Sequence, residues 1–518
     1  MARLTESQGK RVLAAAGIVV PRGEVASSAA AAGAAARALG GAVVVKGLAW
    51  TTGRAGQGLI AFAADAAEAE RSAAAILGRS VKGFPISEVL VEERLEIAAE
   101  RFASIILDDR RRRPVLLVSS RGGTGVEEVA REHPEAVAEL SLDVMEPPPV
   151  AALGALWQSI GVPAGEAEKL AAATALLWRV ARGVEARAAE INPLVVTRRG
   201  DVVALDCRIT VDDAAVFRHP ELAIDVARDL GHPPSPLERI AWEVERDDYR
   251  GTFYFMQMRE RFARGERVVA FHGAGGGGSM MAMDALQRRG FSVANFCDTS
   301  GNPPASKVYR AARVLLSQPN VDGYFGSGSG VASQEQFHSA RGLVKAFREE
   351  PLAVPAVIRL GGNGEEKAIE ILTGYTRDLG VSVECYGKDT PVDECAARLE
   401  TLVEAARSFP DPGPRTPDPG PARRPYTFAT PTGSITYDHT VCATCVSKAC
   451  IAACVPQILS LDEGGLPVLN VTREDAAKGR CIECLACEVD CRALGAGGGH
   501  VSLPIPGLDE YRRARGME

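Results

Sequence analysis

The chain has 518 residues, 46% of them hydrophobic and 24% charged, which is long enough for three or more domains with large cores. A net charge of −7 gives no reason to expect a nucleic-acid partner. The N-terminus has no charged start followed by an apolar run, and the Ala-rich stretch at residues 26–36 is too short for a membrane span, so the predicted location is cytoplasmic.

The first elements predicted along the chain are two helices and a strand. Thr5 and Gln8 fit a capping box at the start of a short amphipathic helix. An Ala-rich helix is predicted over residues 26–39, and a buried strand over residues 42–46. The strand ends in Lys46, and a lysine at the end of an apolar strand is well placed to meet phosphate.

A glycine-rich loop at residues 51–58 follows this strand and contains Gly53 and Arg54. Its backbone N–H groups are free to bind phosphate oxygens. Loops of this kind are more often ordinary turns, so the residues alone leave both interpretations open.

A polar Glu-Ile-Asn-Pro turn at residues 190–193 precedes a predicted β-hairpin over residues 194–205. Side-by-side strands would bring the amide oxygen of Asn192 next to the carboxylate of Asp206, and such oxygen ligands suit Mg²⁺. Glu190 would then stand beside the metal as an acid or base. The spacing is equally compatible with a surface hairpin that has polar ends.

From Arg267 onward, strands, glycine-rich loops and helices alternate. This pattern predicts an open parallel sheet with helices on both faces and ligands at the carboxyl ends of the strands. Glycine loops at residues 272–278, 326–330 and 361–364 open onto helix N-termini, so this edge of the sheet is expected to bind an anion.

Residues 189–222, which begin Ala-Glu-Ile-Asn-Pro-Leu, resemble the metal-binding end of the ATP-grasp half of succinyl-CoA synthetase β subunits. The resemblance implies that Asn192 and Asp206 bind the Mg²⁺ of the nucleotide and that Glu190 is the catalytic carboxylate. The family usually continues Leu-Asp-Gly-Lys, whereas Cys207 and Arg208 follow Asp206 here. A differently shaped loop is therefore expected at this point.

The N-terminal order of strand, lysine, Gly-Arg loop and strand resembles the ATP entry of the same family, and residues 89–93 resemble its adenine-side hinge strand. For the two acids of this strand, Glu92 and Glu93, the alternative is that they lie at the solvent-exposed end of an ordinary strand. The resemblance implies nucleotide contacts at Lys46, Gly53, Arg54, Glu92, Glu93 and Glu100.

The second half resembles the C-terminal ligase domain of these synthetases and, in places, ATP-citrate lyase. The family's phosphohistidine and CoA-binding domain belong to an α subunit, and no matching motif is found in this sequence. His272 and His338 lie near the predicted anion edge but are more often polar structural residues. An α-type partner that carries the phosphohistidine and binds CoA is therefore expected. The resemblance implies substrate or phosphate contacts at Ser300, Gly301, Asn302, Gly328, Gly330, Arg359 and Asn363.

Eight of the twelve cysteines lie between residues 442 and 491, after a Pro-rich linker. Their close spacing indicates a local inorganic site. The second set has the spacing Cys-x₂-Cys-x₂-Cys-x₃-Cys, and the first set is two residues longer. Iron–sulfur clusters are favoured over zinc, which also uses paired Cys-x₂-Cys motifs. Cys207, Cys297, Cys385 and Cys395 are isolated and are predicted to be small apolar fillers.

This segment resembles two-cluster bacterial ferredoxins. The resemblance implies that one [4Fe-4S] cluster is bound by Cys442, Cys445, Cys450 and Cys491, and the other by Cys481, Cys484, Cys487 and Cys454.

The predicted fold class is α/β. Its parts are an ATP-grasp domain at residues 1–225, a connecting segment at 226–262, a doubly wound, flavodoxin-like CoA-ligase domain at 263–407, a Pro-rich linker at 408–431 and a small α+β ferredoxin-like domain at 432–518.

Together the resemblances imply the β-type subunit of an ADP-forming acyl-CoA synthetase. Phosphate would pass from ATP to the partner's histidine and then to an organic acid, and CoA would attack the acyl phosphate. The clusters would couple this ligase to an oxidoreductase or ferredoxin partner. Two alternatives remain: an electron-transfer subunit in which ATP binding or hydrolysis gates cluster reduction, and clusters that are purely structural or redox-sensing.

Overall fold

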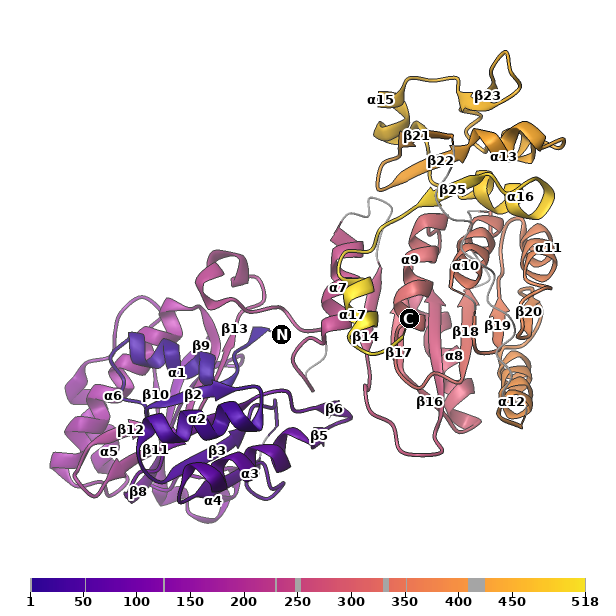
Figure 1. The fold of residues 1–518 in the computed structure, drawn as a ribbon. Helices are drawn as coiled ribbons and strands as arrows, with labels where there is room; N and C mark the ends of the chain where they lie inside the picture. Colours follow the sequence, from indigo (N-terminus) through magenta and orange to yellow (C-terminus); the bar gives the residue numbers. More distant parts are fainter. Residues whose placement is uncertain are drawn as a thin grey trace. The chain divides into compact units, whose positions relative to one another are not determined.

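The computed structural model describes residues 2–51, 53–123, 126–228, 231–246, 253–328, 335–350, 352–408 and 424–517. Contacts divide the chain into two compact units, Met1–Pro234 and Ser235–Glu518 (Figure 1). Each unit has hydrophobic cores of its own. Within the described ranges, no helix is long and apolar enough to cross a bilayer.

The larger sheet of the first unit has seven strands in the order β1-β13-β11-β8-β9-β10, with β12 paired to β11. Helices α1, α5 and α6 pack on one face of it and build the main core of this unit. The strands are β1 (Ala2–Arg3), β8 (Ile97–Asp108), β9 (Arg113–Ser119), β10 (Val137–Ser141), β11 (Ala186–Thr197), β12 (Val202–Ala204) and β13 (Cys207–Val211), and the helices are α1 (Glu6–Ala15), α5 (Val150–Ser159) and α6 (Ala164–Gly183).

A four-stranded sheet in the order β2-β7-β3-β4 forms the second layer of this unit. Val43, Val45 and Val91 pack against helices α2 and α3. Because side chains alternate along a strand, Lys46 and Glu92 lie on the opposite face of the sheet. The elements are β2 (Gly23–Ala26), β3 (Val43–Gly47), β4 (Ile60–Ala63), β7 (Val89–Glu93), α2 (Ala29–Leu39) and α3 (Ala66–Leu77). The short strands β5 (Ser80–Val81) and β6 (Phe84–Pro85) come between α3 and β7, and helix α4 (Val126–Glu132) follows β9.

The capping box predicted for the first helix is confirmed. Thr5 Oγ1 accepts from the Gln8 backbone N–H at 3.3 Å, and Gln8 Oε1 accepts from the Thr5 N–H at 2.9 Å. The Ala-rich helix begins at Ala29 and not at residue 26, because the Ser28 side chain caps it.

The predicted hairpin is present, but the turn predicted at residues 190–193 is wrong. Leu194 pairs with Ala204 across β11 and β12, as expected for the hairpin. Residues 190–193 lie inside β11, because Glu190 and Ile191 pair with β8 on one side and β13 on the other. The Asn192 N–H donates to the Asp206 carbonyl at 3.0 Å, so these two residues are neighbours.

The second unit is built on a seven-stranded sheet in the order β14-β17-β15-β18-β19-β20, with β16 paired to β15. It is parallel apart from β14, and helices cover both faces, as predicted. The elements are β14 (Tyr254–Gln257), β15 (Arg267–Ala274), β16 (Phe291–Val293), β17 (Asn295–Asp298), β18 (Gly323–Gly328), β19 (Ala356–Arg359), β20 (Val383–Tyr386), α8 (Gly276–Arg288), α9 (Ala305–Leu316), α10 (Phe337–Glu349), α11 (Glu365–Tyr375) and α12 (Val392–Ser408).

The segment at 226–262 is not a simple connector, which corrects the predicted boundary. Its helix α7 (Pro236–Arg246) and strand β14 belong to the second unit. Phe253 and Phe255 are fully buried there, so β14 gains a large apolar area by joining the edge of the sheet.

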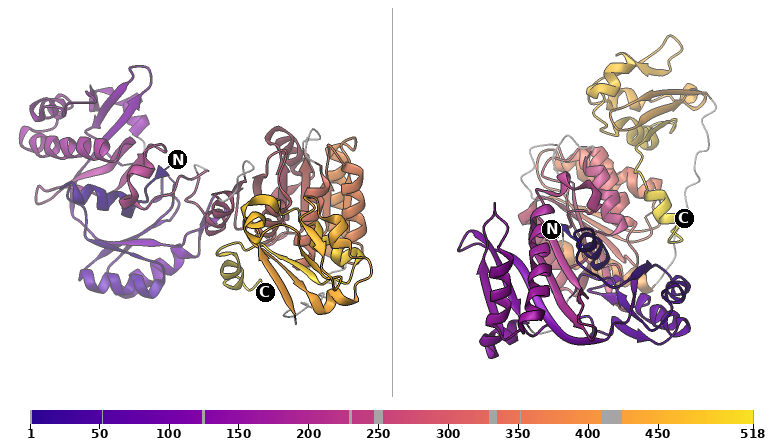
Figure 2. Two further views of the ribbon diagram at one scale, coloured as in Figure 1. Left: turned by 90° about the horizontal axis from the view of Figure 1, so that it is seen from above. Right: turned by 90° about the vertical axis from the view of Figure 1, so that its left-hand side faces the viewer.

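The C-terminal segment of the second unit holds a three-stranded sheet, a short hairpin and small helices (Figures 1 and 2). Its last helix, α17, packs against α7. Residues 409–423 of the predicted linker lie outside the described residues, and the linker's last residues already form a strand. The elements are β21 (Pro425–Ala429), β22 (Ser434–Asp438), β23 (Leu459–Leu461), β24 (Pro467–Leu469), β25 (Gly499–Ser502), α13 (His439–Thr444), α14 (Ala449–Ala453), α15 (Arg473–Asp475), α16 (Ala486–Leu494) and α17 (Leu508–Arg513).

Candidate functional site

The predicted nucleotide contacts Lys46 and Arg54 meet at a buried carboxylate, Glu6, in the first unit. Lys46 Nζ lies 2.9 Å from Glu6 Oε1, and Arg54 Nη2 lies 2.5 Å from Glu6 Oε2. Lys10, one helical turn after Glu6, adds a third cation at 2.7 Å. Glu6 thus holds three cations, with its own side chain only 3% exposed.

Two further carboxylates complete this charged cluster. Glu92 accepts a hydrogen bond from Lys10 at 2.5 Å and forms an ion pair with Lys46 at 2.8 Å. Asp206 Oδ2 lies 2.7 Å from Arg54 Nη2. The cluster of Glu6, Lys10, Lys46, Arg54, Glu92 and Asp206, named the charged cluster below, therefore contains three cations and three carboxylates.

The charged cluster shifts the pKa values of its members strongly. Burial alone would raise the pKa of the Glu6 carboxyl, but Lys46, Lys10 and Arg54 hold it far below its usual range. Burial and the nearby Glu6 raise the pKa of Asp206. Lys46 keeps its proton, since Glu6 and Glu92 raise its pKa against the effect of burial. A buried network of this kind is costly to break by removing one member.

The predicted metal ligand Asn192 and the catalytic candidate Glu190 lie on β11 beside this cluster. Asn192 Oδ1 accepts from the Gly123 N–H at 2.9 Å. A Cβ on Gly123 would stand 3.0 Å from Glu100 Oε2, so Glu100 borders the same glycine turn. Glu190 is half-buried, and in the strand pairing it lies directly opposite Arg208 of β13. The amide oxygen of Asn192 and the carboxylate oxygens of Glu100 and Glu190 are of the kind that Mg²⁺ prefers.

The hinge acids differ from each other in their surroundings. Glu92 is only 2% exposed and faces the cations, so the solvated strand end considered for it is wrong. Its carboxylate is paired with both Lys10 and Lys46. Glu93 is half-buried and pairs with Arg22 at 2.7 Å. Gly53, also predicted to contact nucleotide, is exposed with a φ of 64°.

Cys207, the residue after Asp206, stands where the family's Leu-Asp-Gly-Lys pattern has a glycine. Cys207 is buried against helix α1, where a Cβ on Gly9 would stand only 2.7 Å from its sulfur. The thiol fills the space that a glycine in the helix leaves open. It acts as an apolar filler, as predicted, and burial raises its pKa well above the usual range.

Neutralising the centre of the charged cluster is expected to destabilise the first unit. A Glu6→Gln variant leaves Lys10, Lys46 and Arg54 with one carboxylate fewer, and we expect it to lose about 3 kcal/mol of unfolding free energy. Mg-ATP is expected to raise the unfolding temperature of this variant more than that of the parent, because polyphosphate replaces the lost charge. Thermal unfolding with and without Mg-ATP measures both effects. Glu24→Gln, on an exposed position of β2, is the control, and equal stability of Glu6→Gln and the parent would contradict the prediction.

In the second unit, the predicted substrate loop follows β17. Asp298 Oδ1 accepts from the N–H groups of Gly275 and Ser300 at 2.9 and 2.8 Å, and Ser300 has a φ of 64°. Gly301 is half-buried, and Asn302 is exposed. The loop is therefore tied to the N-terminus of α8, with Asn302 near solvent.

Arg359 holds loops together in this structure. Its guanidinium donates to the carbonyl oxygens of Gly328, Lys388 and Thr390 at 3.1, 2.6 and 2.8 Å. In this structure its guanidinium thus positions the loop at Gly328, and the predicted substrate contact of Arg359 stays a prediction. Asn363 accepts from the Gln336 N–H at 2.7 Å through its backbone carbonyl. Gly330 lies outside the described residues.

His272 is fully buried between Tyr324 and Thr299, with Nδ1 2.5 Å from the Tyr324 hydroxyl. Burial lowers its pKa to about 4, so it is neutral at physiological pH. Its surroundings are those of a structural histidine, which agrees with the interpretation favoured from the sequence, that of a polar structural residue.

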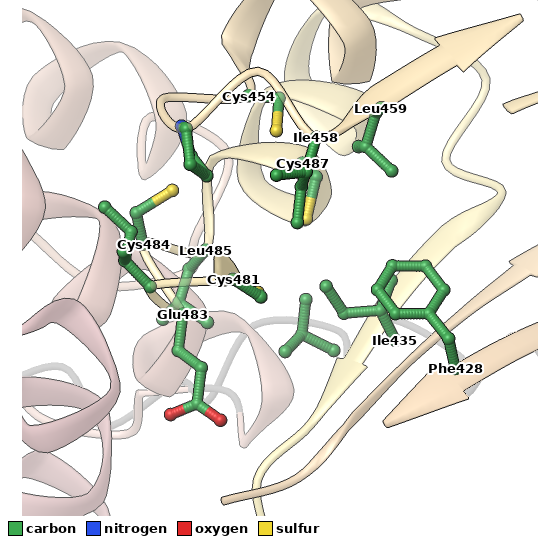
Figure 3. Close-up of a pocket in the computed structure, with 13 residues that line it drawn as sticks. Phe428, Ile435, Cys454, Ile458, Leu459, Cys481, Glu483, Cys484, Leu485 and Cys487 are labelled. Carbon is green, nitrogen blue, oxygen red and sulfur yellow. The ribbon is translucent and has the colours of Figure 1, made fainter. Parts of the chain in front are cut away.

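Four of the clustered cysteines border one small pocket in the C-terminal segment (Figure 3). Apolar side chains, including Phe428 and Ile435, line its other side. Glu483 fixes the loop by accepting from the Thr430 hydroxyl at 2.7 Å and from the Thr432 N–H at 2.7 Å. The cysteines of this pocket are Cys454, Cys481, Cys484 and Cys487.

The other four, Cys442, Cys445, Cys450 and Cys491, lie around the N-terminal end of β25. The Cys450 thiol donates to Cys491, and this bond, with N–H groups of residues 497–499, lowers the pKa of Cys491 to about 6 against the effect of burial. A Cβ on Gly498 would stand 2.9 Å from Cys442 Sγ, so glycine is needed for this close approach. Among the described side chains, no three His, Cys, Asp or Glu groups converge to hold a single metal ion.

Sequence reasoning did not predict that the cysteine-rich segment would pack on helix α10. Lys345 Nζ lies 2.8 Å from Glu488, and Arg341 lies 2.9 Å from Asp490 on α16. All four side chains are at most 10% exposed. The sequence signal that could have predicted this contact is the pair of cations, Arg341 and Lys345, four residues apart on a helix whose other residues are mostly apolar or small.

Comparisons with known proteins define the class of these folds. A family model of the ATP-grasp domain matches residues 3–196, and a model of the citrate-binding domain of ATP citrate lyase matches residues 263–399. The fold resembles that of an ATP citrate lyase from Methanothrix soehngenii, with a TM-score of 0.52 and 20% identity over 77% of this chain and 99% of that one. The chain is thus a mixed α/β protein with an ATP-grasp domain and a second domain like that of ATP citrate lyase.

Sequence relatives give the family. The chain is 36% identical to the β subunit of a GDP-forming succinate–CoA ligase from Thermus thermophilus, over 72% of this chain and 93% of the relative. It is 33% identical to the β subunit of an ADP-forming succinate–CoA ligase from Rubrobacter xylanophilus, over 78% and 98%. The chain belongs to the family of succinate–CoA ligase β subunits, which are acid–CoA ligases. Both matched model ranges end before the clustered cysteines.

Proposed function

We propose that this chain is the nucleotide-binding β-type subunit of an ADP-forming acid–CoA ligase, with ATP and Mg²⁺ bound in the first unit. The observation that carries this proposal is the convergence of Lys46, Arg54 and Asp206 around Glu6 of helix α1, with Asn192 nearby. Cations for phosphate and oxygen ligands for a divalent ion are the two requirements of a phosphoryl-transfer site.

Binding of ATP would rearrange the charged cluster. Lys46 and Arg54 would exchange part of their pairing with Glu6 and Asp206 for phosphate oxygens, and Asp206 with Asn192 would hold the Mg²⁺. The ion would neutralise phosphate charge. Glu190 would orient or move a proton at the phosphoryl acceptor. The acceptor would be a histidine on an α-type partner, which would also bind CoA, as in the subunit pairs formed by this family.

Acyl-hydroxamate formation tests this function. The chain and its α-type partner are incubated with Mg-ATP, CoA, hydroxylamine and a panel of organic acids that includes succinate and citrate. The proposal expects hydroxamate with at least one acid, dependent on both subunits and on Mg²⁺. Formation with no acid in the panel would count against a ligase.

We further propose that the C-terminal segment is ferredoxin-like and binds two [4Fe-4S] clusters, which would couple the ligase to an oxidoreductase or ferredoxin partner. Its residues suit such clusters: two sets of four cysteines, apolar walls beside one set, and N–H groups aimed at a sulfur of the other. Each thiolate of such a cluster binds a different iron, so the sulfurs need not converge on one point. The clusters, when bound, would supply one-electron transfer.

The second candidate function is an electron-transfer subunit in which nucleotide binding gates cluster reduction. Its structural basis is that Glu488 and Asp490 of α16, which lie between Cys487 and Cys491, are ion-paired to helix α10, so the cysteine-rich segment is joined to the rest of the second unit. Reducible clusters without hydroxamate formation would support this function over the ligase.

Loss of one cluster ligand separates the roles of the two parts. We expect a Cys484→Ser variant to bind about half the iron and sulfide of the parent and to keep ligase activity within about twofold, because the first unit holds the nucleotide. Iron and sulfide analysis, visible absorption and the hydroxamate assay make the measurement. Cys385→Ser, outside both sets, is the control. Full iron content would contradict the ligand assignment, and loss of ligase activity would indicate that the clusters are structural.

A further inference from the structure

Arg3 lies on the edge strand of the large sheet and was not singled out from the sequence. It pairs with Thr210 of β13, and Arg208 of the same strand pairs with Glu190 of β11. Residues directly opposite one another, and those two apart along a strand, share one face of a sheet. Arg3, Arg208 and Glu190 therefore share the face opposite helices α1, α5 and α6, which is the face of the candidate nucleotide site.

The guanidinium of Arg3 differs from the other cations of this site in its partners. Lys46 and Arg54 are both paired with carboxylates. In the part of the chain that the structure describes, Arg3 has neither an ion pair nor a side-chain hydrogen bond, and its contact is the Trp50 ring, 5.7 Å away. The side chain is half-buried, so its N–H groups are shielded from much of the solvent and still open to a ligand.

The charges around Arg3 favour an anion there. Burial, with Arg208 and Arg54 nearby, lowers its pKa to about 10, while Asp206 and Glu190 act in the opposite direction. Arg208 and Glu190 share the face of the sheet on which Arg3 lies, and Arg54 contacts Asp206, the predicted metal ligand. A planar guanidinium with its five donors suits the oxygens of a phosphate.

We propose that Arg3 is a phosphate-binding residue of the nucleotide site and contacts the terminal phosphate of a bound nucleoside triphosphate. This inference rests on the proposed function. The terminal phosphate is the one expected beside Glu190 and the Mg²⁺ ligands, because transfer takes place there. The Trp50 ring lies on one side of the guanidinium, at a distance suited to a cation–π contact.

Binding of ATP and ADP by an Arg3→Met variant tests this proposal. The Kd of Mg-ATP, measured by calorimetry on the full chain, is expected to rise by about 10- to 100-fold, since a charged hydrogen bond to phosphate is lost. The Kd of Mg-ADP, which lacks the terminal phosphate, is expected to change less than about threefold. Arg3→Lys keeps the charge and is expected to recover much of the ATP affinity.

Matched controls keep the outcomes distinct. Arg199→Met removes an exposed arginine from the β11–β12 turn of the same sheet and is expected to leave both affinities unchanged. Unfolding temperatures show that each variant is folded. Parent-like Mg-ATP affinity in Arg3→Met, or an equal loss for ATP and ADP, overturns the role of Arg3 and leaves the proposed function standing. A parent chain that binds no Mg-ATP rejects both.

Discussion

An Asp206→Asn variant is expected to transfer phosphate on the order of 100- to 1,000-fold more slowly than the parent. The substitution removes the charged oxygen ligand proposed for Mg²⁺ and releases Arg54 from its 2.7 Å contact. Arg54 then pairs with Glu6 alone, so both the metal and a phosphate contact are disturbed. Phosphate transfer to the partner subunit, measured at several Mg²⁺ concentrations, gives the effect.

A second aspartate on the same hairpin is the control for this variant. Asp201 is exposed in the turn between β11 and β12, and Asp201→Asn is expected to retain the parent rate. If Asp206→Asn also keeps the parent rate and the parent's dependence on Mg²⁺, the predicted metal site is wrong.

The other large effect is expected where the cysteine-rich segment packs on helix α10. A Lys345→Met variant leaves the Glu488 carboxylate buried without its closest cation, and we expect a loss of about 3–5 kcal/mol from the unfolding free energy of this unit. The double variant Lys345→Met, Glu488→Gln is expected to recover most of it, because the charges that then lose a partner, on Arg492 and Glu349, are partly exposed to solvent. Urea unfolding of the full chain, followed by cluster absorption, makes the measurement.

The control for this pair is an ion pair of the same residue types in solvent. Lys478 and Glu474 are 72% and 74% exposed, and Lys478→Met is expected to change stability little. Equal effects of Lys345→Met and Lys478→Met would mean that the contact between α10 and α16 does not hold the two parts together.

Local patterns in the sequence predicted much of the fold. Thr5 and Gln8 identify the start of α1, and the alternation after Leu194 identifies the hairpin, because capping and pairing there depend on near neighbours. Strand β14 was missed, because its place at the sheet edge is fixed by β17, some forty residues away.

The candidate site was predicted less completely than the fold. Lys46, Arg54 and Asp206 were singled out, and the structure brings these three together around Glu6. Glu6 itself was not singled out, since nothing local shows that Lys46 and Arg54, 40 and 48 positions away, are among its partners. The same reason hides the contact between Lys345 and Glu488, which joins residues of distant segments.

Formation of phosphohistidine on the partner subunit tests the central claim most directly. The chain and its α-type partner are mixed with Mg²⁺ and ATP labelled at the terminal phosphate, without CoA or organic acid, and both subunits are separated under alkaline conditions. We expect an acid-labile label on a histidine of the partner, absent when Mg²⁺ is removed or when Asp206→Asn replaces the parent. A label that does not form, or that forms in the Asp206→Asn variant at the parent rate, would contradict it.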